Sequence, residues 1–347
     1  MKVLGANQLK RISILILKAV GTQENEAEIV ADSLVEANLR GVDSHGVFRL
    51  PVYVNRIKHK TIIPGAPFTV VRETPSTALV NGGSGFGQVI GVKSMQLALD
   101  KARVTGIGTV SVFDTNHFGM AAYYAMIALQ NDMIGIITSN TSPYVVPWGG
   151  RVPMLGTNPL CVATPSEQNI PIILDMATSA TARGRIERAA KEGKPIPKGW
   201  AVNENGVPTT DSVAALKGAL LPFGGPKGYG LCFILDVISG ALAGAECGKA
   251  VHSLYPEEYK CNVGQFFLAI NVDSFIPIRN FKVAVDKVVR ELKSCPPASG
   301  YAEVLIPGEI EYRTKQKRLL EGIPLSSEAW QSLKKLCKEL KVEIDLQ

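Results

Sequence analysis

The sequence predicts a mixed α/β protein of the α+β type. Long helical patterns occupy the two ends of the chain, and from about residue 68 short runs rich in β-branched residues alternate with further helices. The 347 residues are 46% hydrophobic and 20% charged, which is typical of a globular protein with a large core. These three observations together favour a central sheet flanked by helices, with a mainly helical part built from the chain ends.

Two helices are expected before residue 41. The first runs over residues 7–19 with Asn7 as its N-cap, and the second over residues 23–40 with Thr22 as its N-cap. Apolar residues recur in the second at the 3.6-residue period, and Gly41 is a suitable C-terminal stop. The polar segment DSHG therefore begins just beyond a helix end, where a side chain can project from a well-anchored loop.

The middle of the chain predicts strands and helices in alternation. The strand-like runs are TALV, GTVSVF, IGIITS, LCVATP and PIILD, and helices are expected over residues 88–104 and 121–131. The apolar window 228–245 predicts a helix buried against its neighbours, and residues 191–211 predict a long surface loop. Further helices are expected over residues 282–293 and 327–340, the last with Ser327 as a possible cap.

Charge and cysteine usage exclude several classes of function. The net charge of +6 is scattered, and aromatic residues make up only 7%, so no basic stripe with stacking aromatics suggests nucleic-acid binding. The six cysteines form no CxxC pair, which argues against a zinc ribbon and favours free thiols. The N-terminal apolar run is too short for a secretory signal, so we expect a cytoplasmic protein without a membrane span.

A glycine-rich stretch, VNGGSGFGQVIG, follows a strand-like run and opens a predicted helix. Its spacing gives GxGxG and GxGxxxG but not the GxGxxG of a Rossmann nucleotide-binding loop, although Asp114 ends the next strand-like run. A tight structural turn is the favoured interpretation. Lys93 lacks the preceding glycine that a P-loop requires.

Two of the four histidines, His45 and His117, lie in polar loops next to glycine. Either one can give or take a proton near neutral pH, although a hydrogen-bonded structural histidine is the alternative for each. Adjacent side chains on an extended chain point to opposite faces, so Ser44 is not expected to pair with His45. Arg49 lies four residues after His45 and faces the same way if a short helix begins near Gly46, where it could hold a substrate carboxylate.

Taken in order, the motifs of this chain resemble the malate/L-lactate dehydrogenases of the second, non-Rossmann type. This family also includes sulfolactate, ureidoglycolate and diketogulonate enzymes and cyclic-imine carboxylate reductases. The matching segments span most of the chain; they are DSHGVFRL, NHFGMAAYYA, PWGG, GTNPL, LDMATSATARG, GWAVNENGVPTTD, LPFGGPKGYGL and IPGEIE.

The resemblance implies a non-Rossmann, NAD- or NADP-dependent oxidoreductase that transfers hydride between nicotinamide and a small 2-hydroxy or 2-oxo acid. Malate and oxaloacetate are the first choice, with lactate and pyruvate or sulfolactate next. It further implies a homodimer and no need for a metal. The alternatives are an NAD(P)H-dependent reductase of a cyclic imine carboxylate, a nucleotide-binding protein without turnover, and a hydrolase or lyase.

By motif position, the resemblance implies that His117 or His45 is the proton donor, with a slight preference for His117. Ser44 and Arg49 then belong to the substrate site. The implied cofactor-binding residues are Thr141, Asp175, Met176, Ala177, Lys227, Pro307, Gly308 and Glu309.

The resemblance and the helical patterns together predict the domain organisation. Residues 1–72 and 310–347 would form a mainly helical subdomain on the dimer and substrate side, and residues 73–309 an α/β domain. The cofactor-binding region would span roughly residues 120–285. The exact acid, the preference between NAD and NADP, the choice between the two histidines and the oligomeric state stay open at this stage.

Overall fold

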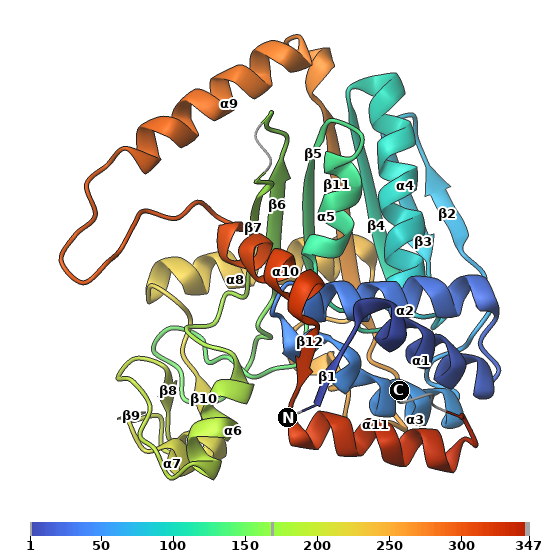
Figure 1. Cartoon of the computed structure of the whole chain (residues 1–347), viewed down its shortest axis with the longest axis vertical. Helices are drawn as coiled ribbons and strands as arrows, with labels where there is room; N and C mark the ends of the chain where they lie inside the picture. Colours follow the sequence, from blue (N-terminus) through green and yellow to red (C-terminus); the bar gives the residue numbers. More distant parts are fainter. Residues whose placement is uncertain (1, 168–169, 344–347) are drawn as a thin grey trace.

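The computed structural model describes residues 2–167 and 170–343 and confirms the mixed α/β architecture. At its centre lies a seven-stranded mixed sheet (Figure 1). Neighbours β3 and β4 run parallel, and the other neighbouring pairs of this sheet run antiparallel. In order across the sheet the strands are β2 (Thr69–Glu73), β3 (Thr77–Asn81), β4 (Ile107–Thr115), β11 (Val263–Asn271), β5 (Met133–Ser139), β6 (Leu160–Thr164) and β7 (Ile172–Met176).

These strand directions bring distant loops to one edge of the sheet. The carboxyl ends of β3, β4, β5 and β7 meet the amino ends of β6 and β11 there, as the pairings of Thr115 with Val263 and of Met176 with Leu160 show. His117, Thr141 and Ala177 follow directly after three of these strands. The edge therefore collects candidate residues that the sequence keeps far apart.

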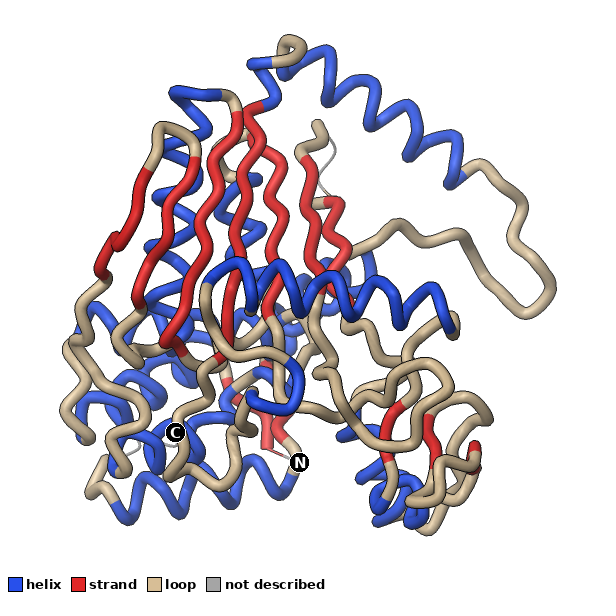
Figure 2. Tube along the Cα trace, turned by 180° about the vertical axis from the view of Figure 1, so that it is seen from behind, coloured by secondary structure: helices blue, strands red, loops and turns tan. Residues whose placement is uncertain are grey.

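One face of the sheet packs against α4 (Gly87–Thr105) and α5 (Ala122–Leu129), which lie in front of it in Figure 1. Val112 and Phe267 point to this side and are fully buried. On the opposite face, Phe266 and Leu268 are only half-buried. Figure 2 shows that face with α8 (Pro226–Ser239) crossing the strand ends, while in the described part of the chain no helix covers its upper region.

The two ends of the chain form one helical lobe below the sheet. Its helices are α1 (Ala6–Ala19), α2 (Glu24–Leu39), α3 (Leu50–Lys58) and α11 (Ser327–Glu339), and β1 (Lys2–Leu4) pairs with β12 (Ile323–Leu325). Leu9, Leu34, Tyr53 and Leu336 belong to a single buried cluster in this lobe. Helix α10 (Glu309–Glu321) packs on α2. The shared core supports a helical subdomain built from both termini, and its boundaries remain our prediction.

A small lobe replaces the predicted surface loop over residues 191–211. It contains α6 (Arg183–Lys191), β8 (Ala201–Val202), β9 (Pro208–Thr209), α7 (Ser212–Lys217) and β10 (Ala219–Leu220). Buried Ile186, Ile196 and Leu220 form its core. The loop prediction was wrong for residues 201–209, because two-residue strands in a glycine- and proline-rich segment carry no periodic signal.

Three expected caps differ from the structure. Gly5 and Gln23 occupy the N-cap positions of α1 and α2 without a capping side chain, so Asn7 and Thr22 do not cap them. Ser326, not Ser327, caps α11, and its hydroxyl accepts a hydrogen bond from the backbone N–H of Ala329. Helix α9 (Ile278–Lys293) begins one turn earlier than expected and projects from the top of the molecule in Figure 1.

The apolar window 228–245 was predicted to be a helix buried against its neighbours, and the structure confirms the helix over residues 228–239 but not its burial. Helix α8 ends at Ser239, and Phe233, Ile234 and Leu242 are 48%, 50% and 61% exposed. An apolar composition indicates that the face of a helix is covered by other residues. It does not show whether these residues belong to the same chain or to another one. Among the described residues no helix is both long enough and apolar enough to cross a membrane.

Candidate active site

The loop that carries His45 is held by the side chain of Asn38 near the end of α2. The Asn38 amide donates to Asp43 Oδ1 at 2.6 Å, and its carbonyl oxygen accepts from the backbone N–H of Val47 at 2.9 Å. Gly46 packs directly on this amide, since a Cβ at that position would lie 2.2 Å from Asn38 Oδ1. Asn38 thus bridges two 3₁₀ turns, η1 (Asp43–His45) and η2 (Val47–Arg49), and fixes the loop between them.

Ser44 and His45 do contact each other, which corrects the expectation from the sequence. Ser44 Oγ lies 3.0 Å from His45 Nδ1. The expectation assumed an extended backbone, but η1 is a tight turn in which adjacent side chains can approach. The hydroxyl therefore orients the His45 ring and leaves its Nε2 without a hydrogen-bond partner among the described residues.

The loop that carries His117 follows β4 and rests on the glycine-rich stretch. The Asn116 amide donates to the carbonyl oxygens of Ser84 and Gly85 at 2.9 and 3.0 Å. A Cβ at Gly87 would lie only 2.2 Å from the carbonyl oxygen of Asn116. These glycines allow α4 to approach the histidine loop closely, so the stretch has a structural role in positioning His117, as favoured from its spacing.

The two histidines meet although they come from the helical lobe and the sheet edge. Their rings stack with centroids 5.5 Å apart and an interplanar angle of 19°. Tyr53 Oη lies 2.7 Å from His117 Nδ1, and Arg49 Nε donates to the carbonyl oxygen of Ser44 at 2.8 Å. Both rings and the arginine are partly accessible, whereas Tyr53 is fully buried. The geometry therefore brings Ser44, His45, Arg49 and His117 together.

The electrostatics of this cluster keep both imidazoles neutral in the free protein. Burial, followed by the charge of Arg49, lowers the pKa of His45 to about 4. Burial also holds the pKa of His117 well below its usual value, with contributions from His45, Arg49 and Arg56. No carboxylate among the described residues pairs with Arg49. A partly accessible arginine without an acidic partner suits an anionic ligand.

Arg56 is a buried support that the sequence analysis missed. It is fully buried and donates to Asn116 Oδ1 at 3.2 Å and to the carbonyl oxygens of Leu254 and Tyr259 at 3.3 and 3.0 Å. It joins α3 to the His117 loop and to the segment 254–259. In the sequence, nothing distinguishes it from the neighbouring polar residues Asn55 and Lys58.

Thr141 and the segment Asp175–Ala177 lie on either side of GTNPL. Thr141 Oγ1 accepts from the backbone N–H of Thr157 at 2.8 Å, and the Thr178 hydroxyl donates to the Thr157 carbonyl oxygen at 3.1 Å. Asp175 Oδ2 accepts from the backbone N–H of Ala122 at 2.8 Å, at the start of α5. The implied cofactor residues of β5 and β7 are thereby placed on the same sheet edge as His117.

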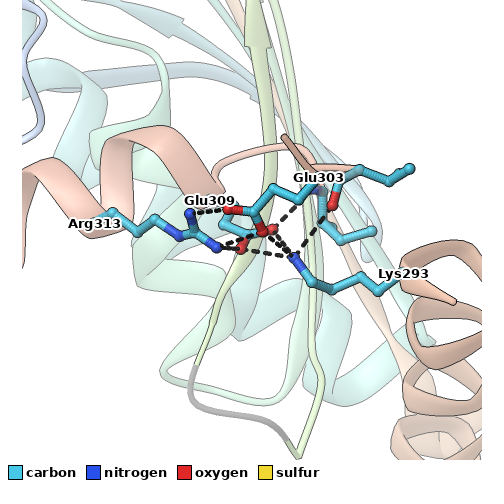
Figure 3. A network of polar contacts seen from close by, with 6 residues as sticks. Lys293, Glu303, Glu309 and Arg313 are labelled. Atoms are coloured by element: carbon cyan, nitrogen blue, oxygen red, sulfur yellow. Dashed lines mark hydrogen bonds and ion pairs between the residues drawn. The ribbon is translucent and has the colours of Figure 1, made fainter. Parts of the chain in front are cut away.

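The segment Pro307–Glu309 lies beside β7. The Pro307 carbonyl oxygen accepts from the backbone N–H of Ile173 at 3.0 Å. The Glu309 carboxylate is fully buried and binds Lys293 and Arg313 in an ion-pair network that includes Glu303 (Figure 3). This carboxylate is already occupied, so we expect any cofactor contact of this residue to come from its backbone.

Lys227 stands in the first turn of α8 and is exposed. It has no ion-pair partner within the described ranges, and the N-cap of α8, Gly225, provides no side-chain cap. The α8 helix is tied to GTNPL because the Asn158 amide donates to the Cys232 carbonyl oxygen at 3.1 Å. A free cation at an uncapped helix N-terminus is suited to phosphate oxygens.

Tyr53 and Gln88 are further site residues that the sequence did not suggest. The Gln88 amide donates to Tyr53 Oη at 2.8 Å, and both residues are fully buried. Tyr53 lies one helical turn beyond Arg49, which is a weak signal. Gln88 carries no signal, since its relation to His117 depends on the packing of α3 against α4.

Comparison with known proteins identifies the family to which these features correspond. The family model for malate/L-lactate dehydrogenase matches residues 4–334. The malate/(S)-sulfolactate dehydrogenase of Methanothermus fervidus is 43% identical over 342 residues, covering 99% of both chains. The structure of sulfolactate dehydrogenase from Methanocaldococcus jannaschii matches with a TM-score of 0.94 and 42% identity over 99% of this chain and 98% of that one. Malate dehydrogenase from Pyrococcus horikoshii OT3 matches with a TM-score of 0.92 and 38% identity, over 99% and 97% of the two chains.

Proposed function

The chain belongs to the malate/L-lactate dehydrogenase family and is a dehydrogenase of 2-hydroxy acids, and on this premise we propose that it interconverts malate and oxaloacetate. L-Sulfolactate and lactate are the next candidates. The observation that supports the proposal most directly is the stack of His45 and His117 beside Arg49. It combines groups that can move a proton with a cation for the substrate carboxylate.

Arg49 is the proposed anchor of that carboxylate. Its guanidinium can form two parallel hydrogen bonds to a carboxylate, and no acidic side chain of the described residues competes for it. Ser44 lies on the same loop, and its hydroxyl can donate to the substrate when His45 Nδ1 is the donor in the contact between the two side chains. Holding the acid group in this way fixes which face of the 2-oxo carbon is presented to the cofactor.

His117 is the proposed acid/base, and His45 is its neighbour. His117 Nδ1 is held by Tyr53 at 2.7 Å, while Nε2 has no hydrogen-bond partner among the described residues. In reduction, Nε2 of a protonated His117 donates to the developing alkoxide. In oxidation, the neutral ring takes the hydroxyl proton of the substrate.

A nicotinamide cofactor is implied by the family, and NAD or NADP is proposed here without a choice between them. When bound, it supplies or accepts the hydride. The residues present fit such a group: Lys227 and the uncapped N-terminus of α8 suit its phosphates. Thr141, Asp175–Ala177 and the backbone of Pro307–Glu309 are the remaining proposed contacts along the sheet edge.

We also propose a homodimer formed through the open face of the sheet. Strands β5 and β11 are apolar on both faces, which is typical of strands covered on both sides. Phe233, Ile234 and Val237 on α8 extend this apolar surface. A second copy is the proposed partner, because an exposed apolar surface of this kind on one chain requires a cover in solution.

Oxidation of reduced cofactor by a panel of acids tests the function. Oxaloacetate, pyruvate, sulfopyruvate and a cyclic imine carboxylate are each offered with NADH and with NADPH, and the loss of nicotinamide absorbance is followed. The proposal expects the highest kcat/KM with oxaloacetate. A preference for the imine would replace it by imine reduction, and no turnover with any acid would contradict the proposed activity.

A further inference from the structure

A buried hydrogen-bond chain runs from Gln88 through Tyr53 to His117 behind the cluster. Gln88 Nε2 lies 2.8 Å from Tyr53 Oη, and Tyr53 Oη lies 2.7 Å from His117 Nδ1. Gln88 and Tyr53 are fully buried, so water cannot substitute for either partner. The chain begins on α4, passes through α3 and ends on the loop after β4.

The direction of the chain determines which nitrogen of His117 carries the proton. A phenol has a single proton, and its oxygen accepts here from the Gln88 amide. The Gly119 backbone N–H also donates to Nδ1, at 3.4 Å, which requires an unprotonated Nδ1, so Tyr53 donates its proton to this nitrogen. With two donors directed at Nδ1, the neutral ring carries its proton on Nε2, the nitrogen without a protein partner.

The opposite direction is also open to the same three side chains. Gln88 Oε1 is buried without a hydrogen-bond partner. If the amide turns over, Oε1 accepts from Tyr53, and Tyr53 Oη is free to accept from a protonated Nδ1. Either direction leaves one amide atom of Gln88 unpaired, and the reversed direction loses only the long 3.4 Å hydrogen bond from the Gly119 N–H to Nδ1.

We propose that Tyr53 and Gln88 are positioning residues that set the tautomer of His117 and reverse it during turnover. This inference rests on the proposed role of His117 as the acid/base. In the direction seen in the structure, Nε2–H faces the substrate. In the reversed direction Nδ1 holds a proton, so the change from the Nε2–H tautomer takes up one proton at Nδ1 and releases one from Nε2 to solvent. In oxidation, Nε2 then takes the hydroxyl proton of the substrate and gives the imidazolium. In reduction, the imidazolium gives its Nε2 proton to the alkoxide and returns to the neutral Nδ1–H ring. The chain thus lets one histidine serve both directions of the reaction.

The tautomer can be measured without substrate by ¹⁵N NMR of the four histidines, with His117→Gln to assign the signal. In the neutral wild-type protein Nδ1 of His117 is expected at the shift of an unprotonated nitrogen. Tyr53→Phe should move it towards the average of the two tautomers. Gln88→Glu, whose ionised carboxylate can only accept, should reverse the tautomer to Nδ1–H. Tyr123→Phe is the matched control, because its hydroxyl binds Asp32 instead.

Activity supplies the second readout. Tyr53→Phe should lower kcat about tenfold or more with little change in KM, and should shift the pH profile, whereas Tyr123→Phe should do neither. A wild-type signal with Nδ1 protonated, or an unchanged signal in Tyr53→Phe, would overturn the inference. Gln88→Met, which removes donor and acceptor together, should behave like Tyr53→Phe and keeps the test decisive if the glutamate variant does not fold. Failure of the acid panel with the NMR result intact would instead contradict the proposed function.

Discussion

His45 and His117 stack with their ring centroids 5.5 Å apart, one on the 3₁₀ turn after α2 and the other on the loop after β4. The contact joins the helical lobe to the edge of the sheet. The positive charge of Arg49 acts on both rings. Each lobe alone contains only part of the proposed machinery, so activity depends on how the two lobes pack.

Replacing His117 by alanine is expected to lower kcat by roughly 10²–10⁴, because the proton donor is lost. His45→Ala should have a smaller effect, mainly on KM. His59→Ala is the control, since this side chain is exposed at the end of α3 and makes none of these contacts. Steady-state kinetics with the preferred acid give kcat and KM for each variant. A greater loss of kcat in His45→Ala than in His117→Ala would exchange the two roles.

Arg49→Ala should weaken binding of the 2-oxo acid by about 1.5–3 kcal/mol, the range for a hydrogen bond to a charged group. This corresponds to a roughly 10- to 150-fold increase in KM. Arg72→Ala, on the exposed edge strand β2, should leave KM unchanged. An unchanged KM in Arg49→Ala would remove this residue from the substrate site.

The lowered pKa values of the two histidines predict how stability depends on pH. Because the folded protein resists protonating these rings, the unfolded chain binds more protons below pH 6.5, and stability falls as the pH is lowered. For His45 the loss develops between pH 6.5 and about 4. Thermal unfolding of the wild type and of His45→Gln across this interval should show a shallower decline in the variant. Parallel curves would argue against a depressed pKa of His45.

Gly46→Ala is expected to destabilise the fold by about 1–3 kcal/mol, because the added methyl group would collide with the Asn38 amide. Gly184→Ala is the matched control, since a Cβ there meets no atom within 4 Å and the position lies in α6. The control should be neutral or stabilised by up to about 1 kcal/mol. Urea unfolding measures both variants, and equal midpoints would show that the loop adapts to the methyl group.

Ile234→Asp should convert the proposed dimer into a monomer, because a charge would be buried in an apolar interface. Val104→Asp, also apolar and 82% exposed but on α4 at the covered face of the sheet, is the control. Analytical ultracentrifugation measures the mass of each variant. A wild-type protein that sediments as a monomer at all concentrations would contradict the proposed dimer.

Local sequence signals were sufficient for most elements of the fold. The helical patterns of the sequence, with apolar periodicity in α2, predicted α2 and α4 to within two residues of their observed ends, and β-branched runs predicted strands such as β4 and β5. These signals succeed because helix and strand periodicities depend on neighbours along the chain. The glycine-rich stretch before α4 was also interpreted correctly from spacing alone, as a structural turn.

Local sequence signals did not predict which residues of distant segments contact each other. The sequence placed His45, Arg49 and His117 in loops suited to chemistry, and the ordered motifs identified the family. The contact of Ser44 with His45 depends on a local 3₁₀ turn that was not predicted. Only the tertiary structure left one face of α8 exposed and set Gln88 and Tyr53 behind His117. Periodicity reports which side of an element is apolar, but the partner of a polar side chain is chosen by the packing of whole helices and strands, which no short segment encodes.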